Sequence, residues 1–247
     1  MQPGKRFRNR MEEMKSIYIC VPCYEGKAST KFIGSFALAI SDFTVRNPNT
    51  KVQIDFRSHQ FITYARQKAH ETALLDGYEY ILWWDCDIIA PSNCITRLST
   101  HEKEIVGALV FARTPPFNPV TADTMGNILP GSIKGTGLKK VGSVGTGLML
   151  MNTKVIQSIS KPWWEWPNDG VTAEDFYMCK KLRKQGKEIY VDTDLEVGHI
   201  ATEDQVVDSR LHQVYLQSIK SSGIMNDKRV RSHKDFKKLE GLIRATQ

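Results

Sequence analysis

The chain has 247 residues, of which 41% are hydrophobic and 25% are charged, a composition that supports a large buried core and excludes a wholly disordered protein. Its formal net charge of +7 favours anionic partners, such as nucleotide phosphates, nucleic acid or an acidic membrane surface. No apolar run has the length of a signal peptide or of a membrane-spanning helix. The five cysteines are scattered and odd in number, which indicates a reducing compartment, so we expect a cytoplasmic protein.

Strand and helix patterns alternate through the first half of the chain. Residues 1–15 form a basic arm, and the regular pattern begins at residue 16. The predicted strands are 16–21, 51–56, 80–84 and 104–111, and the predicted helices are 29–46, 61–75 and a short one after residue 91. This alternation is typical of an α/β doubly wound sheet, in which ligands bind beyond the carboxyl ends of the strands.

A long segment of different character opens the second half. Residues 113–146 are rich in Pro, Gly, Ser, Thr and Asn, which predicts loops and a small hairpin. The elements predicted after it are strands at 147–151, 187–192 and 195–199, a short helix at 153–158 and a helix at 172–185. Residues 203–247 predict one or two polar helices with a cluster of Lys and Arg between 228 and 238. We therefore expect one domain over 16–202 and a helical, basic C-terminal extension.

The most informative stretch is YILWWDCD at residues 80–87. Its apolar and aromatic run predicts a central strand that is buried on both faces. The strand ends at Asp85 and Asp87, and residues i and i+2 of an extended segment project to the same side. Two carboxylates held so close can bind a hard cation, although a solvated strand end explains an isolated D-x-D equally well.

Three further residues gain meaning only beside these aspartates. Glu174 and Asp175 lie near the start of a predicted helix, where the helix dipole alone would explain two carboxylates. His199 follows a predicted strand near the end of the domain, where a lone histidine is more often structural than a ligand. Together with Asp85 and Asp87, these residues indicate a site.

Two other motifs are rejected. Cys20 and Cys23 form C-x-x-C, a spacing found in redox and zinc sites, but Cys20 falls inside a predicted strand and the chain is too long for a thioredoxin-like fold. The glycines between residues 131 and 147 match neither the P-loop pattern nor G-x-G-x-x-G. We interpret them as residues that give a loop its freedom.

Six motifs occur in the order found in the GT-A nucleotide-sugar glycosyltransferases. They are VPCYE at 21–25, YARQ at 64–67, ILWWDCDI at 81–88, GTGLML at 145–150, AEDF at 173–176 with GKEI at 186–189, and His199. The chain resembles this family over residues 16–202, and Gln67 departs from the Asn that the family usually carries. The resemblance implies a Rossmann-like doubly wound mixed sheet of the GT-A type, with a C-terminal helical extension over 203–247.

The resemblance also implies roles for individual residues. The implied donor-binding residues are Pro22, Tyr24, Glu25, Arg66 and Asp85, and the implied metal ligands are Asp85, Asp87 and His199. The metal would neutralise the leaving diphosphate as a Lewis acid, and an imidazole beside carboxylates favours Mn²⁺ over Mg²⁺. An inverting enzyme needs a carboxylate as general base, and the family's motif implies Asp175 for that role with Glu174 in support.

The acceptor side is open to several interpretations. Trp163, Trp164 and Trp166 form either a platform that stacks on a sugar or base, or a hydrophobic seal between sheet and loop. The segment 113–146 would be a flexible acceptor-side lid. The basic termini suit nucleic acid and an anionic membrane surface equally well. We expect a glycan or other carbohydrate as acceptor for a UDP-sugar, with a hydroxymethylated DNA base as the alternative.

Two other classes of protein would use the same fold. A non-catalytic protein that binds nucleotide sugars or nucleic acid would not need Asp85, Asp87, Asp175 and His199 together, which disfavours it. A sugar-1-phosphate nucleotidyltransferase would carry a Gly-rich signature with Arg and Lys after the first strand. The residues at 24–27 are YEGK, which match that signature poorly.

Overall fold

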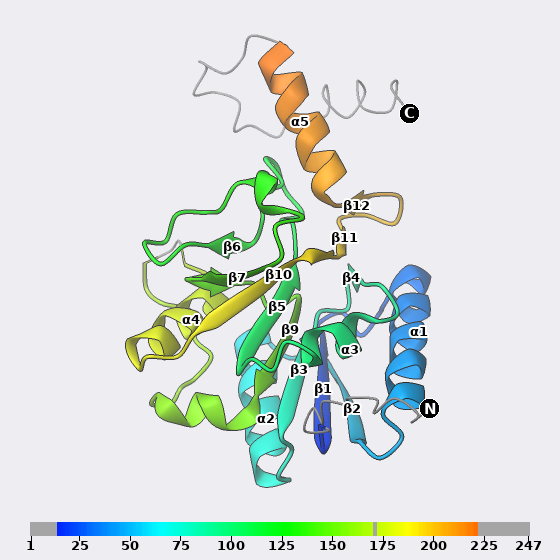
Figure 1. Ribbon diagram of the computed structural model, residues 1–247, viewed down its shortest axis with the longest axis vertical. Coiled ribbons are helices and arrows are strands. Elements are labelled where there is room, and N and C mark those ends of the chain that lie inside the picture. Colours follow the sequence, from blue (N-terminus) through cyan, green and yellow to red (C-terminus); the bar gives the residue numbers. More distant parts are fainter. Residues whose placement is uncertain (1–13, 170–171, 222–247) are drawn as a thin grey trace, which may run out of the picture.

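A mixed sheet of seven strands forms the centre of the protein, whose computed structural model describes residues 14–169 and 172–221 (Figure 1). Its strands, in spatial order, are β2 (Lys51–Ser58), β1 (Ser16–Cys23), β3 (Tyr80–Trp84), β9 (Leu148–Asn152), β5 (Ile105–Leu109), β10 (Ile189–Glu196) and β7 (Leu138–Val141). Strands β9 and β7 are antiparallel to their neighbours, and the other five run in one direction. The carboxyl ends of those five strands therefore share one edge of the sheet.

Helices cover both faces of this sheet. α1 (Thr30–Arg46) and α3 (Cys94–Ser99) lie on one face, and α2 (Ile62–Leu75) and α4 (Glu174–Lys184) lie on the other. α5 (Ser209–Ser221) projects beyond the sheet, and the chain also has 3₁₀ turns η1 (Gly131–Ile133) and η2 (Thr153–Ser158). The remaining short strands are β4 (Ile88–Ile89), β6 (Thr121–Ala122), β8 (Ser143–Val144), β11 (Gly198–Ile200) and β12 (Val206–Val207). This arrangement confirms the predicted α/β doubly wound mixed sheet.

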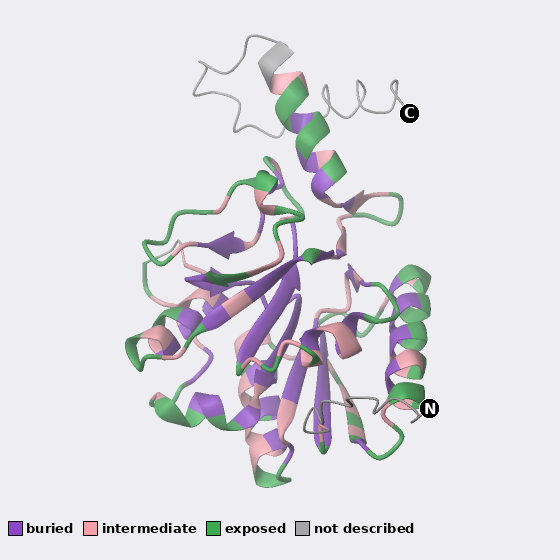
Figure 2. Cartoon of the chain, in the orientation of Figure 1, coloured by how far each residue is buried: buried purple, intermediate pink, exposed green. Residues whose placement is uncertain are grey.

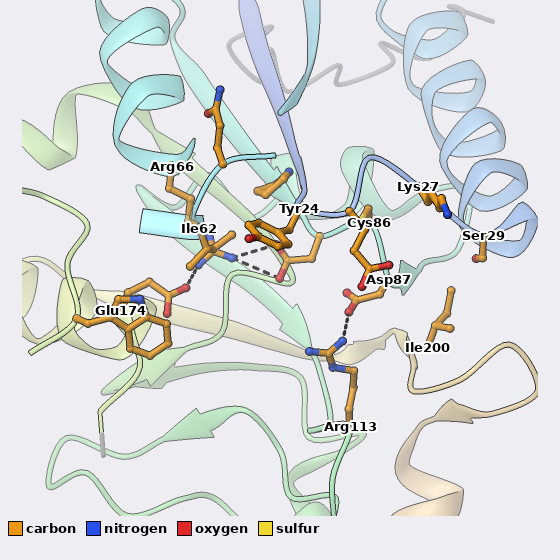
Figure 3. Close-up of a pocket in the computed structure, with 15 residues that line it drawn as sticks. Tyr24, Lys27, Ser29, Ile62, Arg66, Cys86, Asp87, Arg113, Glu174 and Ile200 are labelled. Atoms are coloured by element: carbon orange, nitrogen blue, oxygen red, sulfur yellow. Dashed lines mark hydrogen bonds and ion pairs between the residues drawn. The ribbon is translucent and has the colours of Figure 1, made fainter. Parts of the chain in front are cut away.

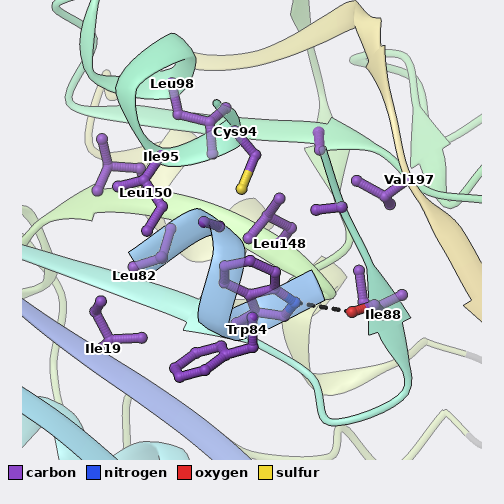
Figure 4. Packing of buried hydrophobic residues seen from close by; sticks show 14 of the residues in the cluster. Ile19, Leu82, Trp84, Ile88, Cys94, Ile95, Leu98, Leu148, Leu150 and Val197 are labelled. Carbon is purple, nitrogen blue, oxygen red and sulfur yellow. Dashed lines mark hydrogen bonds between the residues drawn. The ribbon is translucent and has the colours of Figure 1, made fainter. Parts of the chain in front are cut away.

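The alternation of side chains along the strands builds two separate cores (Figure 2). On one face, Trp84 packs with α1 and α3, and its Nε1 donates a hydrogen bond of 2.9 Å to the carbonyl oxygen of Ile88 (Figure 4). On the other face, Trp83 packs with α2 and α4. Both indoles are fully buried, as the apolar run predicted for a central strand. β3 is therefore held rigidly where it ends at Asp85.

The sequence signals at the ends of α1 explain its boundaries. The Oγ of Ser29 accepts a hydrogen bond of 3.1 Å from the backbone nitrogen of Phe32, which caps the amino terminus. Phe32, Phe36 and Phe43 are all buried against the sheet. The helix thus begins and ends close to the predicted range 29–46, and its first turn lies at the edge of the sheet where the parallel strands end.

The predictions fail most in the segment 113–146. Most of it is irregular, and β6 and β8 form a small antiparallel pair, as predicted, but β7 was not expected and adds an antiparallel edge strand beside β10. Two lysines occupy the centre of β7, so the pattern lacked the apolar alternation of a strand. The boundaries of the strands predicted at 187–192 and 195–199 also differ from those observed, because β10 continues to Glu196 and β11 begins at Gly198.

The beginning of the C-terminal extension is helical, as predicted. Tyr215 of α5 packs with Val207, Phe111 and Phe117 in a third, smaller apolar cluster. Most of the predicted basic arm and the basic cluster at 228–238 lie outside the described residues. Over residues 14–169 and 172–221, the structure contains no helix that is both long and apolar enough to span a bilayer.

A buried histidine makes the stability of this fold depend on pH. His70 of α2 is fully buried between Trp83 and Trp163, and its Nε2 donates a hydrogen bond of 3.0 Å to the carbonyl oxygen of Thr153. Burial lowers the pKa of His70 from 6.5 to about 4, although the bond to Thr153 opposes this shift. The unfolded chain therefore takes up a proton first as the pH falls.

We expect His70 to cost the protein stability below pH 6.5. Between pH 6.5 and about 4 this histidine is protonated in the unfolded chain but not in the native protein. The neutral, buried His70 therefore contributes about 3 kcal/mol to the unfolding free energy above pH 6.5, and this contribution is lost as the pH falls to about 4. His70→Gln keeps a donor for Thr153 but does not titrate. Urea unfolding of both proteins at pH 7, 5.5 and 4 should show a smaller loss for the variant, and parallel losses would contradict this explanation.

Candidate functional site

A pocket of about 560 Å³ opens at the edge where the parallel strands end (Figure 3). It is lined by the end of β1 and the connection from β1 to α1, by the start of α2, by residues that follow β3, and by the segments around residues 113, 166, 174 and 200. The lining residues are Pro22, Tyr24, Glu25, Lys27, Ser29, Gln60, Ile62, Arg66, Asp85, Cys86, Asp87, Arg113, Trp166, Glu174 and Ile200. The predicted donor residues Pro22, Tyr24, Glu25, Arg66 and Asp85 are all among them.

Arg66 joins two carboxylates on one side of the pocket. Its Nη2 lies 3.0 Å from Oδ1 and 3.3 Å from Oδ2 of Asp85, and its Nη1 donates to Oε1 of Glu174. The side chains of Arg66 and Glu174 are almost fully buried, and Arg66 also lies over the ring of Trp164. These contacts join β3, α2 and α4 at one point, so the positions of the three elements depend on one guanidinium group.

Asp87, His199 and Arg113 meet at the other side of the pocket. Oδ2 of Asp87 accepts a hydrogen bond of 2.9 Å from Nη1 of Arg113 and lies 3.4 Å from Nε2 of His199. The sheet explains how a histidine so late in the chain reaches Asp87. β11 pairs with β4, which directly follows Asp87, and the backbone nitrogen of Ile200 donates to the carbonyl oxygen of Asp87.

Asp175 lies beside the segment that joins β8 to β9 and contains Gly145 and Gly147. Its Oδ2 accepts a hydrogen bond of 3.2 Å from the backbone nitrogen of Thr146, and a side chain at Gly145 would come within 3.5 Å of the same oxygen. A side chain at Gly147 would also crowd Ile88, and the carbonyl oxygen of Gly147 accepts from the backbone nitrogen of Asp85. The tightest contact at Gly145 would be with Val120, at 2.8 Å, so the two glycines allow this segment to pack closely against Val120 and Ile88.

Burial and ion pairs set the acid-base properties of these carboxylates. Burial raises the pKa of Asp175 and of Glu174, and the charge of Arg66 opposes both shifts. Burial likewise raises the pKa of Asp85 against the same arginine. Burial also acts to raise the pKa of Asp87, but the contacts with His199 and Arg113 outweigh it and lower that pKa. Asp87 is therefore the member of the group that most favours the ionised form.

The predicted aromatic platform is divided by the structure. Trp163 and Trp164 are buried against His70 and Trp83, as the alternative of a hydrophobic seal requires. Trp166 is 57% exposed and lines the pocket. A local contact explains why Trp163 and Trp164 are buried. Oε1 of Gln67 accepts a hydrogen bond of 2.9 Å from the backbone nitrogen of Trp163 and holds the segment against α2.

Several lining residues were missed at the level of sequence. Arg113 is the most important, because it contacts Asp87 directly. Arg113 comes soon after β5, which ends at the edge of the sheet where the pocket lies, and this position is the signal that could have predicted its place in the site. Lys27 and Ser29 lie between β1 and α1 and also line the pocket, and a residue in that connection is placed near the edge by the doubly wound topology.

Asp87 and His199 fit a divalent cation. Nδ1 of His199 donates a hydrogen bond of 2.8 Å to the carbonyl oxygen of Phe111, so Nε2 is the ring nitrogen left to contact a cation. That nitrogen and Oδ2 of Asp87 face one another, whereas Asp85 is held by Arg66. Among the residues described, no three His, Cys, Asp or Glu side chains are grouped to hold a metal ion.

Comparison with known proteins places the fold but not the activity. No family model matches the chain, and no curated protein sequence matches it. The solved structure of A197 from STIV is similar, with a TM-score of 0.54 and 14% sequence identity over 80% of this chain and 91% of that chain. The chain shares the fold of A197 from STIV.

Two other solved structures have lower scores. A UDP-glucose pyrophosphorylase complexed with UDP-glucose gives a TM-score of 0.45 and 11% identity, covering 83% of this chain and 99% of that chain. A 4-diphosphocytidyl-2C-methyl-D-erythritol synthase from Anaerococcus prevotii DSM 20548 gives 0.42 and 10%, covering 82% and 96%.

Proposed function

We propose that this protein is a metal-dependent glycosyltransferase that moves a sugar from a nucleotide-sugar donor, expected to be a UDP-sugar, to an acceptor hydroxyl. One observation carries the proposal. Residues from four separate motifs, around positions 22–25, 66, 85–87 and 174, line a single pocket of about 560 Å³. That volume suits a small-molecule ligand, and the pocket lies where ligands bind in doubly wound sheets.

The donor would lie across the whole pocket. Tyr24 lines the pocket and is 60% exposed, so its ring would be available to stack on a base. Asp85 would accept from the ribose, because Arg66 holds its carboxylate in place. Asp87 and His199 would hold the cation, which would neutralise the diphosphate as it leaves.

Asp175 is the proposed general base of an inverting transfer. Its buried carboxylate has a raised pKa, which brings it nearer to the range in which a base works well at neutral pH. It lies at the start of α4 next to Glu174, which lines the pocket. In this scheme Asp175 takes the proton of the acceptor hydroxyl as that oxygen attacks the anomeric carbon, and Glu174 keeps Arg66 in place.

Trp166 is the proposed contact for the acceptor. It is exposed and lines the same pocket as Glu174, where an acceptor could approach the sugar. An exposed indole stacks well on the apolar face of a sugar ring, which supports a carbohydrate acceptor. A salt-dependent gel shift with duplex DNA tests the alternative acceptor, and binding that resists moderate salt would favour DNA over carbohydrate.

A thermal-shift screen tests the proposal directly. UDP, GDP, CDP and ADP are each added at 1 mM, with and without MnCl₂. We expect one diphosphate, UDP first, to raise the melting temperature only when Mn²⁺ is present, because a ligand that binds the native state stabilises it by mass action. The matched variant Asp87→Asn should lose that response. If no nucleotide diphosphate stabilises the protein under any condition, the proposal is wrong.

A further inference from the structure

Arg113 occupies the carboxylate oxygen that a cation would need. Its Nη1 lies 2.9 Å from Oδ2 of Asp87 (Figure 3). Nε2 of His199 lies 3.4 Å from the same oxygen. Two proposed metal ligands and one guanidinium therefore converge on a single point. A divalent cation and Arg113 cannot both contact Oδ2 of Asp87 in this arrangement, because two positive groups at contact distance repel.

The two arginines of the pocket differ in how firmly they are held. The side chain of Arg66 is 3% exposed and bonded to two carboxylates, whereas that of Arg113 is 56% exposed and paired with Asp87. An ion pair with one partner so exposed changes an equilibrium by roughly fivefold or less. Arg66 is thus a fixed part of the pocket, and Arg113 can leave Asp87 at small cost.

The backbone around Arg113 is anchored, so the movement would be confined to the side chain. Phe111 and Phe117 on either side are fully buried in the apolar cluster with α5. The backbone nitrogen of Ala112 also donates a hydrogen bond of 2.8 Å to the carbonyl oxygen of Asn118. A long, exposed guanidinium on a fixed backbone can change rotamer without moving the segment.

We infer that Arg113 is an exchangeable counter-ion: it neutralises Asp87 while no cation is bound, and it turns to the diphosphate of the donor when a cation takes its place. The inference rests on the proposed function, which supplies both the cation and the diphosphate. Guanidinium groups match phosphate oxygens in charge and geometry, so the released side chain would have a partner within the pocket it already lines.

This exchange predicts effects of opposite sign in one variant. Arg113→Gln removes the competitor of the cation, so Mn²⁺ alone should bind roughly two- to fivefold more tightly, as measured by the loss of the free Mn²⁺ signal in electron paramagnetic resonance. The same variant lacks a charged donor to phosphate, so UDP at saturating Mn²⁺ should bind about tenfold more weakly by calorimetry. A residue with a merely structural role would not tighten one ligand and weaken the other.

Two matched variants serve as controls. Arg113→Lys keeps the charge and should stay near the wild type for Mn²⁺ while losing part of the UDP affinity, since an ammonium lacks the bidentate fork. Arg46→Gln removes the same charge at the last turn of α1, away from the pocket, and should change neither affinity. The melting temperature of Arg113→Gln should match the wild type, because the lost ion pair is exposed.

The outcomes separate this inference from the proposed function. If the wild type binds Mn²⁺ and UDP but Arg113→Gln leaves both affinities unchanged, or weakens both, the exchange is refuted and the proposed function survives. If the wild type binds neither Mn²⁺ nor UDP, the proposed function fails and the exchange fails with it. The exchange is established if Arg113→Gln binds Mn²⁺ more tightly and UDP more weakly than the wild type, while neither control variant shows both changes.

Discussion

Replacing Arg66 with glutamine should destabilise the protein by about 3–5 kcal/mol, the largest effect we expect on the unfolding free energy. The reason is the burial of Arg66 itself and of its partner Glu174, while its other partner, Asp85, is 29% exposed. Arg66 and Glu174 have side chains that are 3% and 8% exposed, and Asp85 depends on the same guanidinium. Without it, two neighbouring carboxylates remain with no positive partner between them, and both must be protonated or repel one another.

Urea unfolding at pH 7 measures this loss, and two variants make it specific. Glu174→Gln in the Arg66→Gln background should recover part of the loss, because it removes one of the unpaired charges. Arg46→Gln removes an exposed arginine that is paired with Asp42 and should cost less than about 1 kcal/mol. A loss below 1 kcal/mol for Arg66→Gln would mean that this cluster does not hold β3, α2 and α4 together.

Replacing Asp175 with asparagine should abolish sugar transfer, with a fall in turnover of roughly 10²- to 10⁴-fold. Asparagine fills the same space and can still accept from the backbone nitrogen of Thr146, but it cannot take a proton from the acceptor. Asp175 is buried beside Glu174 and is not among the lining residues, so the acceptor hydroxyl would have to reach it beside Glu174. Because Asp175 is proposed to contact the acceptor and neither the donor nor the cation, the affinity for UDP and Mn²⁺ should stay within about twofold of the wild type. Single-turnover kinetics and calorimetry separate these two quantities.

Glu174→Gln is the comparison that decides which carboxylate is the base. Glu174 lines the pocket and is bonded to Arg66, so its loss should weaken donor binding and stability more than the chemical step. The roles must be exchanged if Glu174→Gln shows the larger fall in turnover and Asp175→Asn transfers sugar normally. Near-normal turnover of both variants would instead point to a retaining mechanism.

The sequence predicted the fold well where apolar patterns were strong. The buried run that ends at Trp84, the helix of 29–46 with its cap at Ser29 and the helix at 61–75 all lie close to the predicted boundaries. It failed at β7, which has two lysines at its centre and owes its place to pairing with β10. Pairing between distant segments leaves no periodic signal in either of them.

The sequence predicted which residues belong to the candidate site but not how their side chains contact one another. Arg66, Asp85 and Glu174 come from separate motifs and line one pocket, because the ends of parallel strands and the starts of helices meet at one edge of the sheet. Ion pairing could not be predicted, since it depends on side-chain positions that only the packed chain fixes. For this reason the sequence does not predict the contact of Arg113 with Asp87, and it allows the burial of Trp164 against Trp83 only as one of two alternatives.

The most direct test of the central claim is the release of nucleotide diphosphate from a panel of nucleotide sugars. The wild-type protein should release UDP from at least one UDP-sugar when Mn²⁺ is present, slowly to water and faster with a carbohydrate acceptor. Chelation of the metal and the variant Asp87→Asn should each abolish that release. Failure to release diphosphate from any nucleotide sugar, or equal release by Asp87→Asn, would contradict the assignment of this pocket to sugar transfer.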